Sequence, residues 1–170
     1  CNLRSRTIGP TPAELEVLIR VASRVPDHGK LAPWRFVLLE GTDKAAYAAR
    51  LEALATERCD ARAATKLAKL KAPPMAIAVV SRPAPAEIPE WEQLLSAGAV
   101  CTTLLYAAQS MGYGANWITD WYSYDSDARA ALGLSPDERV AGFIMLGTAQ
   151  EAPLERERPD PAPLISRWRP

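Results

Sequence analysis

The chain has 170 residues, 48% of them hydrophobic, and its 20 lysines and arginines balance its 20 aspartates and glutamates. A chain of this length can bury a core without disulfides or metal, so we expect one domain over residues 1–170. The formal net charge of zero gives no sign of a nucleic-acid partner, and no apolar run approaches the roughly 20 residues of a membrane helix.

The three cysteines, Cys1, Cys59 and Cys101, are far apart, and no Cys-x-x-Cys or Cys/His pair occurs at metal spacing. Cys101 sits in an apolar run, so we expect it to be a small buried hydrophobic residue. A reducing cytoplasm is the expected location. Because the chain begins at Cys1 without a signal-peptide pattern, we expect the true N-terminus to precede Cys1.

The first half of the chain opens with a helix signal, since Thr11, Pro12 and Glu14 have the spacing of a capping box with proline in the first turn. In order, this half predicts a helix from Thr11 to Pro26, a loop from Pro26 to Pro33, a strand at Trp34–Leu39, a turn at Gly41-Thr42-Asp43, and two helices within Lys44–Leu70, broken near Cys59-Asp60.

The second half is dominated by a long helix signal over Glu90–Met111, apolar nearly all round between Ala97 and Ala108, as in a helix buried in a core or an interface. Around it we predict a buried strand at Met75–Val80, a loop at Arg82–Pro89, a strand at Ala115–Thr119, a helix at Ser126–Leu132, a strand at Val140–Leu146 and an extended proline-rich tail from Thr148. These elements predict an α+β fold with about four strands.

Several nucleotide and nucleophile motifs are absent. There is no phosphate loop and no nucleophile elbow, and Gly112-Tyr113-Gly114 follows a helix and lacks the third glycine of a dinucleotide fingerprint. Because His28 is the only histidine, a multi-histidine metal site is impossible.

One proline-bracketed loop gathers three polar side chains, Arg24, His28 and Lys30. Such a loop can present hydrogen-bond donors to an anionic or carbonyl-rich ligand. The alternative is a surface turn with solvated charges.

Four segments in the same order resemble the nitroreductase superfamily, most closely its short single-domain NAD(P)H nitroreductases. They are the loop Arg24–Phe36 with its Pro-Trp-Arg-Phe end, the helix start Trp91–Ala99, the turn Gly112–Trp117 and the strand Val140–Thr148. The resemblance implies a nitroreductase-like sheet flanked by helices in a homodimer, with the tail wrapped onto the partner. It further implies FMN as cofactor, NADH or NADPH as electron donor, and a nitroaromatic, a quinone or a similar small molecule as acceptor. The flavin carries this chemistry, so no catalytic side chain is required of the protein.

The resemblance also implies cofactor-binding residues, with each FMN held by both subunits. Arg24 matches an FMN contact, and His28 matches a residue that reaches the FMN of the other subunit. The remaining matches are Trp117, Ile118 and Thr119 at a strand end that lines the flavin, and Ala107, Ala108, Gln109, Ser110, Met111 and Gly112 in a stretch assigned to the nicotinamide cofactor. The alternatives are that Arg24 caps its helix and that Trp117 belongs to the core.

The chain departs from the family pattern at two places. Family members open with Arg-Arg-Ser for the FMN phosphate, and Cys1 falls at the serine position, so both arginines would precede it. Lys30 and Ala32 stand where Asn and Gln are commoner; Lys30 would donate toward the flavin N1/O2 edge, or be a solvated surface lysine. Two other functions stay open: a flavin-binding protein without turnover, and a dimeric scaffold without FMN.

Overall fold

The computed structural model describes residues 9–149, 151–152 and 154–169. Its α-helices are α1 Pro12–Ala22, α2 Gly41–Glu57, α3 Ala61–Lys66, α4 Ala68–Lys71, α5 Glu90–Ser110 and α6 Ser126–Ala131. Its strands are β1 Trp34–Glu40, β2 Met75–Ser81, β3 Gly114–Ile118 and β4 Arg139–Gly147. Three short 3-10 helices are η1 His28–Lys30, η2 Trp121–Ser123 and η3 Ala162–Leu164.

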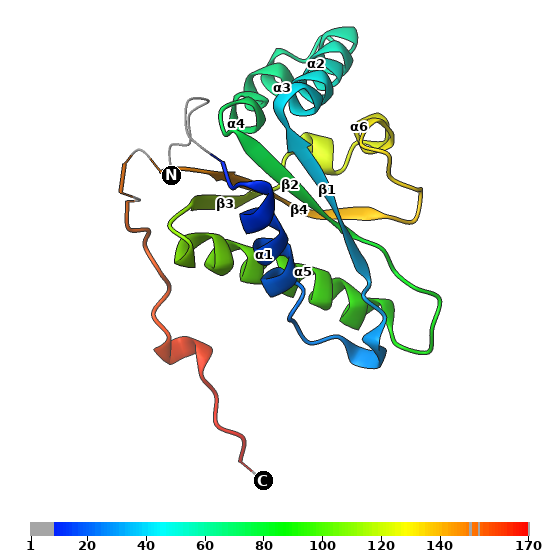
Figure 1. Ribbon diagram of the computed structural model, residues 1–170. Helices are drawn as coiled ribbons and strands as arrows, with labels where there is room; N and C mark the ends of the chain where they lie inside the picture. The colour runs from blue at the N-terminus through cyan, green and yellow to red at the C-terminus, as the bar shows by residue number, and fades with distance from the viewer. Residues whose placement is uncertain (1–8, 150, 153, 170) are drawn as a thin grey trace.

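The four strands form one sheet in the order β1-β2-β4-β3, and each neighbouring pair is antiparallel (Figure 1). Strand β2 is buried along its whole length because it lies inside the sheet and both faces are covered. This explains its continuous apolar run in the sequence. The predicted α+β fold and its four strands are confirmed.

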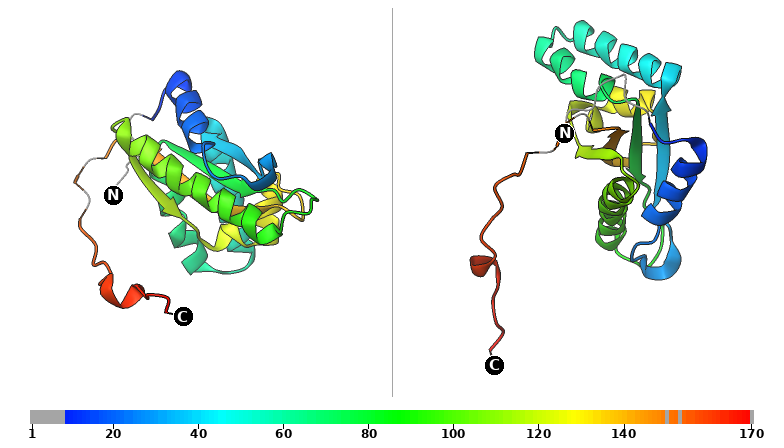
Figure 2. Two further views of the ribbon diagram at one scale, coloured as in Figure 1. Left: turned by 90° about the horizontal axis from the view of Figure 1, so that it is seen from below. Right: turned by 60° about the vertical axis from the view of Figure 1, so that its left-hand side comes forward.

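Helices cover the two faces of the sheet in separate groups. One core cluster packs the sheet against α2, α4 and α6, and the other packs it against α1 and α5. Helices α2, α3 and α4 lie together at the top of Figure 1. Helix α5 runs along the lower part of the sheet, and α1 packs beside it; two further views are given in Figure 2. Alternate residues of β2 serve the two clusters, with Ala76 and Ala78 in the first and Ile77 and Val79 in the second.

The helix starts follow their local capping signals. Thr11 and Glu14 form the predicted capping box, with Thr11 N donating to Glu14 Oε2 at 2.8 Å and Glu14 N donating to Thr11 Oγ1 at 3.3 Å. The break near Cys59-Asp60 is also confirmed. Cys59 adopts a φ of 53°, and the Asp60 carboxylate accepts from Ala63 N at 2.8 Å to cap α3.

Two local predictions were wrong. The predicted turn at Gly41-Thr42-Asp43 is the first turn of α2, which begins directly after β1; Asp43 favours this position because its charge complements the helix dipole. The region Lys44–Leu70 holds three helices rather than two, since α3 and α4 meet at Leu67.

Cys101 is fully buried in α5, as predicted, and burial raises the pKa of its thiol to about 12. Within the described ranges, no helix is long and apolar enough to span a membrane. Nor do those ranges contain a cluster of three or more His, Cys, Asp or Glu side chains suited to a metal ion.

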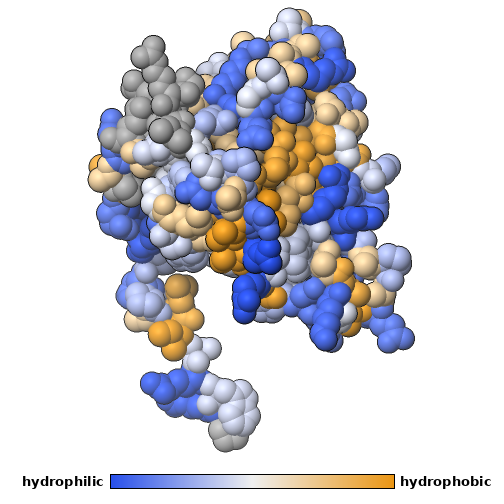
Figure 3. All heavy atoms as spheres, viewed as in Figure 1, coloured by the Kyte–Doolittle hydropathy of each residue, from blue (hydrophilic) through white to orange (hydrophobic). Residues whose placement is uncertain are grey.

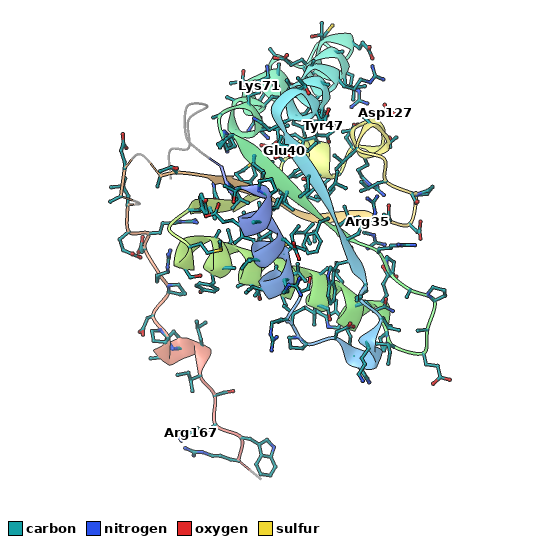
Figure 4. All side chains as sticks on the ribbon, in the orientation of Figure 1. Arg35, Glu40, Tyr47, Lys71, Asp127 and Arg167 are labelled. Atoms are coloured by element: carbon teal, nitrogen blue, oxygen red, sulfur yellow. The ribbon has the colours of Figure 1, made fainter. Side chains whose placement is uncertain are left out.

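The tail after β4 extends away from the body of the molecule, and Arg167 lies near its far end (Figures 1 and 4). Its apolar side chains are exposed, Leu154 to 93% and Trp168 to 86%. Apolar atoms also gather around η3, where Leu164 and Ile165 are exposed (Figure 3). A segment with these exposures contributes little to the core of its own chain.

Candidate cofactor site

The loop between α1 and β1 is held in an unusual backbone conformation. The Asp27 carboxylate accepts from Leu31 N at 3.1 Å and from Ala32 N at 2.8 Å. Lys30 and Ala32 have φ values of 55° and 45°, in the left-handed region that non-glycine residues seldom adopt. The two bonds to Asp27 therefore fix a strained loop, a feature that occurs often at binding sites.

Arg24 and Lys30 are exposed cations at this loop. Neither forms an ion pair or a side-chain hydrogen bond with another residue in the described part of the chain. The end of α1 is capped instead by Ser23, whose N and Oγ donate to Ile19 O at 3.0 and 2.9 Å. The Arg24 side chain is thus not the helix cap, and both cations are available to an anionic ligand.

His28 lies against the start of α5. Its Nδ1 is 2.7 Å from Glu92 Oε2, and its side chain is 63% exposed. One turn further along α5, Ser96 Oγ donates to Pro26 O at 2.8 Å. Beside these contacts is an open cavity of about 340 Å³ lined by Pro26, His28, Glu92, Leu95, Ser96 and Ala99.

The stretch that matches the nicotinamide site lies at the opposite end of α5. Ala107 and Ala108 are buried in the core, so their side chains are not available to a ligand. Gln109, Ser110 and Gly112 are exposed, and Gly112 ends the helix with a φ of 85°. Met111 is partly buried and packs against the same cluster.

Trp117, Ile118 and Thr119 lie at the end of β3, an edge strand. Trp117 is 37% exposed, so it is not a core residue, whereas Ile118 is partly buried against the first core cluster. The Trp117 indole occupies the place of a side chain at Gly142 on β4, since a Cβ there would lie 2.0 Å from Nε1. Gly142 therefore lets the ring lie close to the sheet.

Within one chain, the loop that carries His28 and the stretch that matches the nicotinamide site are not brought together. Glu92, beside His28, and Ala107 are separated along α5 by roughly 22 Å, at 1.5 Å per residue. Cys1, the remaining candidate, lies outside the described residues.

The outer side of α5 carries a stripe of exposed apolar side chains. Trp91, Leu95 and Tyr106 are exposed to 67%, 53% and 69%. At about 100° of rotation per residue they fall within an arc of about 60° on one side of the helix. The apolar pattern predicted a helix buried in a core or an interface; the inner side is core, and the outer side is an uncovered apolar stripe.

Sequence reasoning missed the role of Arg35, which lies in the Pro-Trp-Arg-Phe segment at the end of the loop Arg24–Phe36. Arg35 lies on β1 (Figure 4). Its Nε and Nη2 donate to Oε1 and Oε2 of Glu138, the residue before β4, at 2.6 and 2.7 Å. The Arg35 guanidinium holds the pKa of Glu138 down at about 2. Because 103 residues separate the pair, no local sequence signal indicated it.

The arrangement of sheet and helices is that of known nitroreductase-like proteins. A nitroreductase-like family protein from Bacillus cereus superposes with a TM-score of 0.86 at 20% identity, covering 98% of this chain and 89% of the other. A nitroreductase with bound FMN from Bacteroides fragilis superposes with a TM-score of 0.73 at 18% identity, covering 99% and 92%. These likenesses define the fold class.

The amino-acid sequence identifies the family. The model of the nitroreductase family matches residues 6–148. The chain is 31% identical over 161 residues to the "Putative NAD(P)H nitroreductase YdjA" of Escherichia coli K12, covering 92% of this chain and 88% of YdjA. The chain belongs to the nitroreductase family.

Proposed function

We propose that the protein is an FMN-dependent oxidoreductase that passes electrons from NADH or NADPH to a small acceptor such as a nitroaromatic compound or a quinone. The observation that carries this proposal is a pair of exposed cations, Arg24 and Lys30, without an ion-pair partner among the described residues, on a loop held in place by Asp27. Family membership adds the kind of ligand: the relative from Bacteroides fragilis has bound FMN, and the name of YdjA refers to NAD(P)H.

The side chains of the chain suit the parts of FMN. Arg24 provides positive charge for a contact with FMN, and Lys30 provides it for the N1/O2 edge of the ring system. Trp117 offers a partly exposed apolar ring to the isoalloxazine system. When bound, FMN supplies the hydride and electron-transfer chemistry, and the residues of the protein bind it, orient it and limit access of water.

The proposed enzyme is a homodimer. The stripe of Trp91, Leu95 and Tyr106 and the apolar side chains of the tail are surfaces that a second copy would cover. A two-fold arrangement of two copies would also allow His28 of one chain to reach an FMN held by the other. The tail then packs on the second subunit.

The test is the visible spectrum of the purified full-length protein, followed by steady-state oxidation of NADH and NADPH with a nitroaromatic compound or a quinone. We expect yellow protein whose flavin bands bleach under one or both nucleotides, with continuous turnover. Flavin bands without turnover would identify a flavin-binding protein that is not an enzyme. Failure to retain flavin after supplementation with FMN would identify a scaffold and refute the proposal.

A further inference from the structure

The Glu92 carboxylate, in the first turn of α5, pairs with the ring of His28 in the loop after α1. Its Oε2 lies 2.7 Å from His28 Nδ1, and its carboxylate pairs with no other residue in the described part of the chain. A carboxylate in its anionic form only accepts hydrogen bonds. The proton between the two groups is therefore carried by Nδ1.

The loop backbone is held without Glu92. Asp27 accepts from Leu31 N and Ala32 N, and Ser96 Oγ donates to Pro26 O. Gly29, with a φ of 77°, packs so closely on the segment before α5 that a Cβ there would lie 3.1 Å from Ile88 Cγ1. Since these contacts already position the backbone around His28, what the Glu92 carboxylate determines is the orientation of the ring.

With Nδ1 occupied, Nε2 is the nitrogen left for a ligand. It has no partner among the described residues, and the side chain is 63% exposed beside the open cavity. We propose that Glu92 is the positioning residue of His28: it keeps the proton on Nδ1 and presents Nε2 to the flavin of the second subunit.

The part of this inference that concerns flavin rests on the proposed function, whereas the orientation of the ring does not. A neutral imidazole in this tautomer accepts a hydrogen bond at Nε2, so it suits a donor such as flavin N3–H or a ribityl hydroxyl. A carboxylate that orients a histidine through its other nitrogen plays the same part in many metal sites.

The orientation is tested by NMR on the full-length protein without added flavin. Because His28 is the only histidine, the imidazole region of a ¹⁵N spectrum contains one ring. In alkaline buffer, where neutral imidazole predominates, we expect the Nδ1–H tautomer in the wild type. Glu92→Ala should convert it to the Nε2–H tautomer that free imidazole prefers in water. Glu92→Gln, whose amide oxygen still accepts, should retain Nδ1–H.

The matched control is Glu90→Gln, which removes a charge from the same turn of α5 at a residue whose nearest cation is Arg139, 3.4 Å away. It should leave the tautomer unchanged. An Nε2–H tautomer in the wild type, or no change in Glu92→Ala, would overturn the assignment of Glu92.

The consequence for the cofactor is tested by titration of FMN. Glu92→Ala should weaken FMN binding by about tenfold, the scale of one hydrogen bond. The double variant His28→Ala/Glu92→Ala should bind FMN as His28→Ala does, because Glu92 acts through His28. Independent, additive losses would refute the positioning role. If the wild type retains no FMN at all, the proposed function fails, while the NMR result still decides the role of Glu92.

Discussion

The indole ring of Trp117 fills the space that a side chain at Gly142 would need. The two residues lie on neighbouring strands, β3 and β4, and a Cβ added at Gly142 would lie 2.0 Å from Trp117 Nε1 and 2.5 Å from Cδ1. The absence of a side chain at one position therefore sets the position of an aromatic ring at a candidate flavin surface.

Gly142→Ala should lower the free energy of unfolding by about 1–3 kcal/mol, the usual cost of overpacking, because either the indole or the strand must move. The measurement is urea unfolding. In a Trp117→Ala background the same substitution should cost almost nothing, because the clashing ring is gone. Gly9→Ala is the control, since a Cβ there would lie 3.6 Å from Pro74, at ordinary contact distance. An equal loss in both backgrounds would show that the cost does not come from Trp117.

The ion pair of Arg35 and Glu138 predicts a pH dependence of stability. The folded-state pKa of Glu138 is about 2, below its ordinary value of 4.5. A lowered carboxyl pKa stabilises the fold above the unfolded-state value, and this stabilisation is lost as the pH falls from about 4.5 toward about 2. The difference in unfolding free energy between the wild type and Glu138→Gln should therefore have its largest value at pH 7 and decrease as the pH falls through this range.

Removing the partner cation tests the same pair from the other side. Arg35→Met leaves the buried Glu138 carboxylate unpaired and should cost about 3 kcal/mol of unfolding free energy at neutral pH. Glu90→Gln, which breaks an exposed contact with Arg139, should change stability by less than about 1 kcal/mol. Equal effects of the two substitutions in urea unfolding would contradict the role given to Arg35.

The apolar stripe on α5 predicts the surface used by a second copy. Tyr106 on this stripe and Tyr124 after η2 are exposed to 69% and 70%. Helix α5, which carries Tyr106, and η2, which precedes Tyr124, pack on opposite faces of the sheet. Tyr106→Glu should convert the dimer to monomer in light scattering at micromolar concentration, because a charge in a buried interface is costly. Tyr124→Glu introduces the same charge at the same exposure and should leave the dimer intact. A monomeric wild type would refute the dimer itself.

His28→Ala tests whether the loop takes part in flavin binding. We expect about tenfold weaker FMN binding, since a hydrogen bond to the ligand is lost, and little change in the melting temperature of the flavin-free protein, since the side chain is 63% exposed. The two measurements are FMN titration and thermal unfolding of both proteins. Unchanged affinity with a lowered melting temperature would show that His28 is structural.

Local signals in the sequence determined much of the fold. Three features depend only on residues a few positions apart, so the sequence pattern predicts them: the capping box of Thr11 and Glu14, the break at Cys59-Asp60 and the buried run of β2. Four segments in the same order were likewise enough to indicate the nitroreductase family. The match of the family model to residues 6–148 confirms that prediction.

Only the tertiary structure decided how the candidate site is built. His28 contacts Glu92, 64 positions away in the sequence, and Arg35 contacts Glu138, 103 positions away. Trp117 packs over Gly142 on the neighbouring strand. Such pairs form because helices and strands pack on one sheet, and no spacing in the sequence encodes which side chains will then face each other. The turn predicted at Gly41-Thr42-Asp43 was wrong for a related reason: those residue types suit both a turn and a helix start, and the chain continues into the helix that covers the sheet.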